Sequence, residues 1–323
     1  MNKDLQKIID YLIPVATDPF PRYIFKKEIL RETPSNTDID AIHSSKWYKQ
    51  LADEQWEDGS WGRFHSQDSK AQIKQKFVTT EAALRRAREL GLTKDDPIIE
   101  KCIKLMERYV IGKETWTDNI EKHKDNGKGH MFCRPYMSAA AINMFDSENP
   151  SIKPLRDNAL ESVKKAFGNG LFDVNVWEQD VREYRVPSIA GTGMYGIMLF
   201  QSTNCMEDSL QKQYIDYIWN GKSGIYYVSS MPPADKRSLE DKRFFEWLST
   251  LELLSGFSLF PELMKNDALP HLLNETNRLL NEDIIIPASY NTRYAESWRD
   301  KNNRKNDVIL RILRLLVKCY KGD

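Results

Sequence analysis

Gln55-Trp56-Glu57-Asp58-Gly59-Ser60-Trp61-Gly62 is the stretch of this chain that decides its fold. A Gln, three residues, a Gly, one residue and a Trp predict a compact turn between two helical segments. Weaker versions of the turn recur, because Trp116, Phe172 and Tyr226 follow Trp61 at successive intervals of 55, 56 and 54 residues. A repeat of nearly constant period indicates a chain built from copies of one supersecondary unit.

The segments around each turn also alternate in character. A charged amphipathic segment comes before the turn; in residues 152–167 the apolar side chains fall on one face at helical spacing. A segment without charges comes after it, as in residues 136–145 and 189–200. Because a helix without a charged face is usually covered on more than one side, the alternation predicts solvated outer helices and enclosed inner helices.

Two further helices are expected before the first turn. One covers residues 5–12, and the other starts after Asp18-Pro19-Phe20-Pro21, where Asp can cap a helix and Pro is tolerated in its first turn. Counting them gives about six helical hairpins, which can close on themselves. We therefore expect an all-α fold, an (α/α)6 toroid forming a single domain over residues 1–323. Its parts would be an N-terminal hairpin at 1–34 and about five further hairpins at 35–323, with a period near 55 residues.

Composition narrows the class of protein. The 323 residues include 47 basic and 47 acidic side chains, and a zero net charge argues against nucleic acid as a partner. No apolar run reaches the roughly 18 residues that would predict a membrane span. The four cysteines are scattered along the chain, which is typical of reduced thiols in a cytoplasmic protein. The sequence leaves the oligomeric state open.

The segment 51–61, Leu-Ala-Asp-Glu-Gln-Trp-Glu-Asp-Gly-Ser-Trp, resembles the QW motif of the squalene–hopene cyclase and protein prenyltransferase superfamily. Residues 79–97 resemble the passage from an inner to an outer helix in such toroids. The resemblance implies that Gln55 bonds to a helix terminus and that Trp61 packs beside it, across the turn at Gly59. It also implies a terpenoid cyclase-like toroid with a central cavity for a hydrophobic small molecule.

The catalytic motifs of that superfamily are missing from the chain. It contains no Asp-x-Asp-Asp acid motif, no Asp-Asp-x-x-Asp magnesium motif, and no Asp and Cys two residues apart for a prenyltransferase zinc site. Its one Asp-x-Asp, residues 38–40, is expected near a helix N-cap. An enzyme of this type would therefore use other residues.

Two acids are the predicted catalytic residues. Glu81 follows two threonines at the start of the first helix after the deciding turn, and Glu246 lies between Phe245 and Trp247 on another inner helix. An acid among aromatic side chains can serve as a general acid. The alternative is structural: a carboxylate in a first helical turn favours the helix dipole, and the aromatic side chains fill the core.

Aromatic and basic side chains near these helices are the predicted contacts to a small molecule. Aromatic walls suit an apolar molecule or a developing cation, and Arg293 and Arg299 could hold a carboxylate or phosphate. The same arginines could instead close the ring by pairing with Glu296, Asp300 or acids of the N-terminal hairpin. The predicted binding residues are Arg134, Tyr136, Phe245, Trp247, Arg293, Trp298 and Arg299.

His130 and Cys133 form the one pattern that suggests a metal. Both are good zinc ligands, and the His-x-x-Cys spacing can chelate, although a catalytic zinc needs three protein ligands. The alternative is a solvated loop with the cysteine turned into the core. Apart from this possible zinc, no cofactor is expected.

Three functions fit these patterns. The first is an enzyme that binds or transforms a hydrophobic small molecule in the central cavity of a prenyltransferase-like or cyclase-like toroid. The second is a non-catalytic binding or scaffolding toroid. The third is a glycan-active six-hairpin enzyme with a carboxylate pair, for which the charged loop at residues 178–185 is a possible source.

Overall fold

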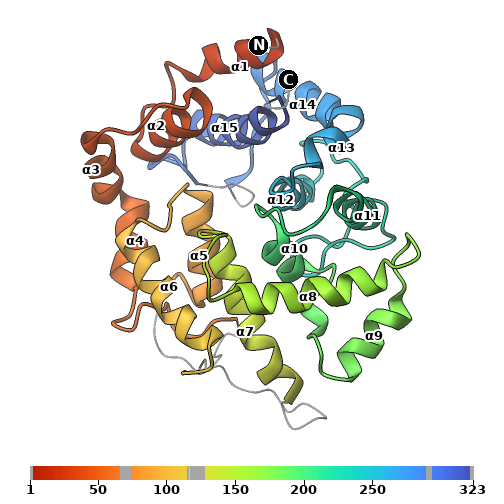
Figure 1. Cartoon of the computed structure of the whole chain (residues 1–323). Coiled ribbons are helices and arrows are strands. Elements are labelled where there is room, and N and C mark those ends of the chain that lie inside the picture. Colours follow the sequence, from red (N-terminus) through yellow and green to blue (C-terminus); the bar gives the residue numbers. More distant parts are fainter. Residues whose placement is uncertain (1–2, 66–74, 115, 117–127, 289–292, 321–323) are drawn as a thin grey trace. The chain divides into compact units, whose positions relative to one another are not determined.

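The computed structural model describes residues 3–65, 75–114, 116, 128–288 and 293–320, and for residues 128–130 it describes the backbone alone. Within these ranges every regular element is a helix, which confirms the all-α prediction. The chain divides into two compact units (Figure 1). Unit 1 consists of Met1–Gln50 with Pro233–Asp323, and unit 2 consists of Leu51–Pro232. The single toroidal domain stays a prediction.

Unit 1 combines the first helices of the chain with the last ones. α15 packs against α1, α13 and α14 (Figure 1). The two helices expected at the N-terminus are present, and Asp18 is the N-cap residue of the second one, although its side chain makes no capping hydrogen bond. Its carboxylate accepts a hydrogen bond from the backbone N–H of Glu296 at 2.8 Å instead. The elements of unit 1 are α1 (Lys3–Leu12), α2 (Pro19–Ile24), the π-helix η1 (Phe25–Leu30), α3 (Asn36–Ser44), the first half of α4 (Lys46–Glu54), α12 (Phe244–Leu254), α13 (Phe260–Asn266), α14 (Ala268–Asn281) and α15 (Lys301–Tyr320).

Hydrogen bonds join the two ends of the chain within unit 1. The backbone N–H of Lys46 donates to Glu296 at 2.8 Å, and the indole N–H of Trp47 donates to the carbonyl of Ala295 at 3.2 Å. Asp307 of α15 is 2% exposed and accepts the N–H of Ala295 at 3.1 Å, which fixes the loop before α15. The first and last segments of the chain therefore belong to one hydrogen-bonded body.

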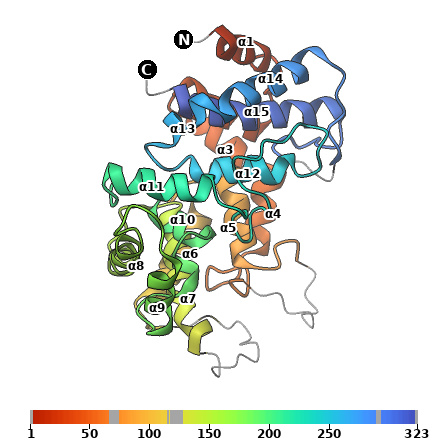
Figure 2. The same ribbon diagram turned by 90° about the vertical axis from the view of Figure 1, so that its right-hand side faces the viewer.

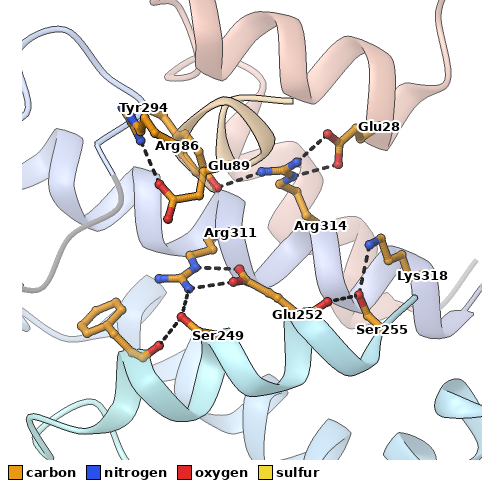
Figure 3. A network of polar contacts seen from close by, with 11 residues as sticks. Glu28, Arg86, Glu89, Ser249, Glu252, Ser255, Tyr294, Arg311, Arg314 and Lys318 are labelled. Carbon is orange, nitrogen blue, oxygen red and sulfur yellow. Dashed lines mark hydrogen bonds and ion pairs between the residues drawn. The ribbon is translucent and has the colours of Figure 1, made fainter. Parts of the chain in front are cut away.

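Charged residues of α15 pair with acids on both sides (Figure 3). Arg311 donates twice to Glu252 of α12, at 2.6 and 2.7 Å, and Arg314 donates twice to Glu28 of η1, at 2.8 and 2.6 Å. Burial alone would raise the pKa of Glu28. The charge and hydrogen bonds of Arg314, with help from Lys318 and a neighbouring lysine, lower that pKa instead. These pairs connect the last helix to early and middle parts of the chain.

Unit 2 contains the deciding turn and the helices that follow it. α7 packs against both α6 and α10 (Figure 2). Every residue of α10 is buried, as predicted for a helix without charged residues, whereas α8 buries one face. The elements of unit 2 are the second half of α4, α5 (Thr80–Glu89), α6 (Pro97–Val110), α7 (Lys128–Asn143), α8 (Lys153–Ala166), α9 (Val174–Arg182), the 3-10 helix η2 (Ser188–Ala190), α10 (Met194–Phe200) and α11 (Asp208–Trp219).

The four aromatic residues of the repeat differ in burial. Trp61 and Trp116 are 0% and 3% exposed. Phe172 is half-buried and its ring lies 4.7 Å from that of Tyr217 on α11. Tyr226 is 71% exposed. The first three aromatic residues therefore hold turns against helices, whereas the ring of Tyr226 is mostly exposed to solvent.

Candidate functional site

The deciding turn is fixed by the side chains that the sequence singled out. The amide of Gln55 donates to the carbonyl of Gly59 at 2.9 Å and to that of Ile98, in the first turn of α6, at 2.7 Å. Trp61 donates its indole N–H to the carbonyl of Leu51 in α4 at 2.8 Å. Gly59 has φ +99°, and a Cβ there would lie 2.7 Å from a backbone oxygen of α6, so only glycine fits.

This turn leads directly into a second set of bonds at the start of α5. The backbone N–H of Trp61 donates to the Thr80 hydroxyl at 2.9 Å, and that hydroxyl donates to the carbonyl of Gly62 at 3.1 Å. The backbone N–H of Glu81 donates to the carbonyl of Phe64 at 3.0 Å. Residues 61–65 therefore run beside the N-terminus of α5, and this places His65 next to Glu81.

His65, Glu81 and Tyr195 form a tight polar cluster. Nδ1 of His65 lies 2.7 Å from Oε2 of Glu81, and the Tyr195 hydroxyl lies 3.0 Å from Oε1 of Glu81. The same hydroxyl lies 3.1 Å from Nδ1 of His65. Tyr195 is 3% exposed, and the side chains of Glu81 and His65 are 12% and 26% exposed. Three groups that can carry or exchange protons thus meet at one half-buried point.

The protonation of this cluster follows from its geometry. Burial raises the pKa of Tyr195 well above its ordinary value, and the negative charge of Glu81 raises it further. Tyr195 therefore stays protonated, and its hydroxyl donates a hydrogen bond to one oxygen of Glu81. The shorter contact, from Nδ1 of His65 to the other oxygen, then carries the Nδ1 proton. A histidine whose Nδ1 is bonded to a carboxylate has the orientation of a histidine base in many enzymes.

Glycines position Tyr195 at the second residue of α10. A Cβ on Gly196 would lie 1.7 Å from the carbonyl oxygen of Gly191, and a Cβ on Gly191 would lie 2.6 Å from the ring of Trp177. The Tyr214 hydroxyl also donates to the carbonyl of Gly191 at 2.8 Å. These close approaches fix the start of α10, and with it the direction of the Tyr195 side chain.

A fourth residue of the site comes from the loop after α11. The Tyr227 ring meets the His65 ring edge-on, with centroids 4.8 Å apart and an interplanar angle of 70°. The Tyr226 ring lies against that of Tyr227, with centroids 4.0 Å apart and an interplanar angle of 46°. Arg85, 57% exposed at its side chain, lies 3.6 Å from the carboxylate of Glu81. The polar cluster therefore has an aromatic side and a basic side.

Glu246, the other predicted catalytic acid, is in different surroundings. Its side chain is exposed on α12, whereas Trp247 is 2% exposed and donates its indole N–H to the carbonyl of Pro233 at 2.8 Å. Phe245 is half-buried, and the guanidinium of Arg311 lies 6.0 Å from its ring centroid. Trp247 and Phe245 therefore make contacts within unit 1, and Glu246 faces away from the buried side of α12.

Arg134 and Tyr136 lie on α7 in unit 2. Arg134 is 6% exposed and donates to the carbonyl of Trp116 at 2.8 Å, and Trp116 donates to the Ser138 hydroxyl at 2.7 Å. Tyr136 is 2% exposed and accepts from the amide of Asn158 at 2.6 Å. Burial raises the pKa of Tyr136. Both predicted binding residues thus hold α7 to its neighbours.

The predicted arginines near the C-terminus stack on one tryptophan. The guanidinium of Arg293 lies 3.9 Å from a ring centroid of Trp298, and that of Arg299 lies 5.8 Å from it. Glu296, one of the acids considered as their partner, accepts instead from the backbone of Lys46. The alternative role, closing the ends of the chain, is carried in unit 1 by Glu296 itself.

The metal prediction falls partly outside the described residues, since the structure does not describe the side chain of His130. Cys133 is half-buried on α7. Among the side chains that are described, no three His, Cys, Asp or Glu residues group as metal ligands. A zinc site at His130 and Cys133 stays a prediction.

The charged loop considered for a carboxylate pair has a structural arrangement. Asp180 is 5% exposed, accepts from the Ser162 hydroxyl at 2.7 Å and pairs with Arg185 at 3.3 Å. Glu178 pairs with Arg182 on the exposed side of α9 at 3.5 Å. Asp180 therefore connects α9 to α8.

Three residues of the site were not predicted from the sequence: His65, Tyr195 and Tyr227. His65 carried only a weak signal, its place three residues after Gly62 and before the helix whose first turn holds Glu81. Tyr195 was visible as the one ionisable side chain in the uncharged segment 189–200. Tyr227 carried no signal beyond its position next to the fourth aromatic of the repeat.

Comparison with protein-family models, with curated proteins and with solved structures gives no match. Among the described helices, none combines the length and the apolar character needed to cross a lipid bilayer, in agreement with the sequence.

Proposed function

We propose that this protein is an enzyme that binds a hydrophobic small molecule and transforms it by acid–base catalysis at the His65–Glu81–Tyr195 cluster. The observation that carries the proposal is the 2.7 Å contact between Nδ1 of His65 and Glu81, with Tyr195 on the second carboxylate oxygen. A histidine held in one tautomer by a carboxylate is a common general base in enzymes.

Each residue of the cluster has a defined role in the proposed reaction. Nε2 of His65 takes a proton from an O–H or an activated C–H group of the substrate, and the imidazole becomes an imidazolium. Glu81 remains ionised and stabilises that positive charge through Nδ1. Tyr195 keeps its own proton and holds Glu81 in place. When Nε2 returns the proton to another atom of the substrate, the cluster regains its starting state, and the reaction has no net gain or loss of protons.

We also infer that the helices form a closed ring of the prenyltransferase and squalene-cyclase type. The meeting of the first and last helices in unit 1 supports this, because a closed ring requires its ends to meet. The bonds of Gln55, Gly59 and Trp61 also agree with what the resemblance implies for its turn. In such a ring the hydrophobic molecule would enter a central cavity.

The experiment is a metabolite-profiling assay. Purified protein is incubated with a small-molecule extract of cells, and mass spectrometry follows the species consumed and formed. His65→Gln and Glu81→Gln should slow turnover by about 10²- to 10⁴-fold, the usual contribution of general acid–base catalysis. His271→Gln in unit 1 is the matched control, because His271 bonds a backbone carbonyl at 2.7 Å and has no part in the cluster.

Equal turnover by wild type and His65→Gln would overturn the catalytic proposal. The alternative, a non-catalytic binding toroid, gains support if the wild-type protein consumes nothing but retains a small molecule in native mass spectrometry. The absence of the superfamily's acid and metal motifs from the sequence is the observation that keeps this alternative open.

A further inference from the structure

We propose that a cleft on unit 2, between α8 and the loop that follows α10, binds small monocarboxylic acids through the guanidinium of Arg156. The cleft has a volume of about 650 Å³ and is lined by Arg156 and Lys164 of α8 and by Cys205 of the loop, among others. None of these residues belongs to the His65–Glu81–Tyr195 cluster, so this second site stands independently of the function proposed above.

Arg156 is a buried cation without an ion-pair partner in the described part of the chain. It is 9% exposed. Both of its hydrogen bonds come from Nη1, to the carbonyl of Ser147 at 2.8 Å and to the side-chain oxygen of Asn143 at 3.1 Å. Nε is buried and has no acceptor among the described residues. A buried charge is costly unless an opposite charge lies near it, so an anion beside Arg156 would be stabilising.

The unused edge of Arg156 is the one with which other arginines of this chain hold carboxylates. Arg311 and Arg314 each donate from Nε and Nη2 to both oxygens of a glutamate, at 2.6 to 2.8 Å (Figure 3). In Arg156, neither of these two nitrogens donates to a described residue. Two N–H groups on one edge of a guanidinium match the two oxygens of a carboxylate. Because Nε is covered by the protein, bidentate contact requires the guanidinium to turn toward the cleft.

A second donor without an acceptor lies in the same hydrogen-bond network. Asn143 of α7, which accepts from Arg156, donates to the carbonyls of Met198 and Gln201 at the end of α10, at 2.7 and 2.8 Å. Gln201 is 0% exposed, and its side-chain Nε2 has no acceptor within the described ranges. Buried donors without acceptors are rare in proteins. The network is therefore rich in donors and short of acceptors, which favours an anionic ligand.

The charges that line the cleft favour an anion with a single negative charge. Two of its three acids already have lysine partners, in the pairs Asp157–Lys153 and Glu161–Lys165. Arg156 and Lys164 then face one further acid, the exposed Glu148. Two cations and one acid leave a net charge of +1, which suits a monocarboxylate better than a phosphate dianion. Leu160 also lines the cleft and offers an apolar contact to the rest of the ligand.

Cys205 provides a local readout of binding. Its side chain is half-buried and lines the same cleft. Burial raises the pKa of the Cys205 thiol, and the hydroxyl of Thr203 and the charge of Arg156 oppose that rise. The charge of Arg156 therefore acts on the thiol, and a ligand bound to Arg156 should slow its alkylation.

The probe is butyrate, with butyramide as the neutral molecule of similar shape and inorganic phosphate as the competing anion. Titration calorimetry of the full-length protein measures binding, and peptide mass spectrometry follows the labelling of each cysteine by iodoacetamide. We expect butyrate to bind with a Kd of about 1 mM, and butyramide and phosphate to bind about tenfold more weakly. Butyrate should slow the labelling of Cys205 and leave that of Cys133, which is half-buried on α7, unchanged.

Three variants assign the binding to the cleft. Arg156→Lys keeps the charge but removes the two-donor edge, and it should weaken butyrate binding about tenfold. Lys164→Gln changes an exposed side chain and should weaken binding about threefold, and it keeps the test valid if thermal unfolding shows that Arg156→Lys does not fold. The matched control is Lys222→Gln, at an exposed lysine that does not line the cleft. This variant should bind butyrate like the wild type.

Several outcomes would overturn the proposal. These are no binding of butyrate by the wild type, equal binding of butyramide, or undiminished labelling of Cys205 in saturating butyrate. Butyrate binding that both Arg156→Lys and Lys164→Gln leave unchanged would place the ligand elsewhere on the protein. Tighter binding of phosphate than of butyrate would reject a carboxylate as the ligand and assign the cleft to phosphate instead.

Discussion

Replacing Gly59 by alanine tests whether the deciding turn holds unit 2 together. Gly59 has φ +99°, and an added Cβ would lie 2.7 Å from the carbonyl oxygen of Lys101 and 3.0 Å from its carbonyl carbon. An L-residue in the left-handed region costs about 1–2 kcal/mol. The clash also forces the turn away from α6, which puts the two hydrogen bonds of the Gln55 amide at risk, each with a net value of about 0.5–1.5 kcal/mol.

The net effect is smaller than the sum of these terms. Alanine restricts the unfolded chain and so returns about 0.4–1 kcal/mol. We therefore expect Gly59→Ala to lower the free energy of unfolding by about 2–3 kcal/mol. For a unit of about 150–250 residues, 1 kcal/mol corresponds to roughly 2–4 °C in Tm, and unit 2, Leu51–Pro232, has this size. The expected decrease in Tm is about 5–10 °C.

Gly112→Ala is the matched control. Gly112 also has a positive φ, +73°, but a Cβ there would meet nothing within 4 Å. This variant carries the conformational cost without the clash, and its Tm should fall by about 2–4 °C. Differential scanning calorimetry of both variants measures the difference. Equal decreases would refute the reasoning, because they would show that the contact with α6 contributes nothing beyond the φ value.

Three further predictions concern single side chains. Glu28→Gln should lower the free energy of unfolding by about 3 kcal/mol in urea titrations, because it leaves Arg314 as a half-buried charge without its carboxylate. Because the pKa of Glu28 is lowered, the pair contributes its full stabilisation above the ordinary pKa of 4.5, and this stabilisation is lost as the pH falls through the folded-state pKa. The difference in unfolding free energy between wild type and Glu28→Gln should therefore shrink in acid. A constant difference down to pH 2 would contradict this. Glu81→Gln should shift the NMR resonances of the His65 ring nitrogens, since it replaces the carboxylate 2.7 Å from Nδ1 by a neutral amide, and unchanged resonances would show that the contact is absent in solution. Tyr227→Gly should change the free energy of unfolding by less than about 1 kcal/mol, against the 3–5 kcal/mol lost when a buried aromatic is truncated, and a loss of the latter size would assign the ring to the core.

Much of the fold could be predicted from local patterns. Helical spacing of apolar residues placed α1 and α8 correctly, because amphipathicity is a property of neighbouring residues. The uncharged segment 189–200 was expected to form one inner helix, but η2 ends at Ala190 and α10 begins only at Met194. The turn from Gln55 to Trp61 was predicted from its spacing, and its Gly59 has the positive φ that such a turn requires. Glu81 was predicted from its place in the first turn of a helix. These features depend on residues within a few positions of one another.

The rest of the site depends on tertiary packing. The Tyr195 hydroxyl and Nδ1 of His65 are 3.1 Å apart in space and 130 positions apart in sequence, and no local pattern joins them. Glu246 is the opposite case, because it was predicted from its neighbours in the sequence. The buried side of α12 includes Phe244, Trp247 and Leu251, at helical spacing from one another, and Glu246 lies off that side. The aromatic neighbours that suggested a buried acid are neighbours in sequence only.

The division of the chain has a consequence for its synthesis on the ribosome. α1 and η1 are synthesised before unit 2, but their partners in unit 1 include α15, which follows it. All of unit 2, Leu51–Pro232, is translated in between, which at 5–20 residues per second takes on the order of 10–40 s. During this interval the apolar face of α1, with Leu5, Ile8, Ile9 and Leu12, has no native cover from α15. The nascent chain should therefore be a client of ribosome-associated chaperones, and slowing translation should lengthen its dependence on them.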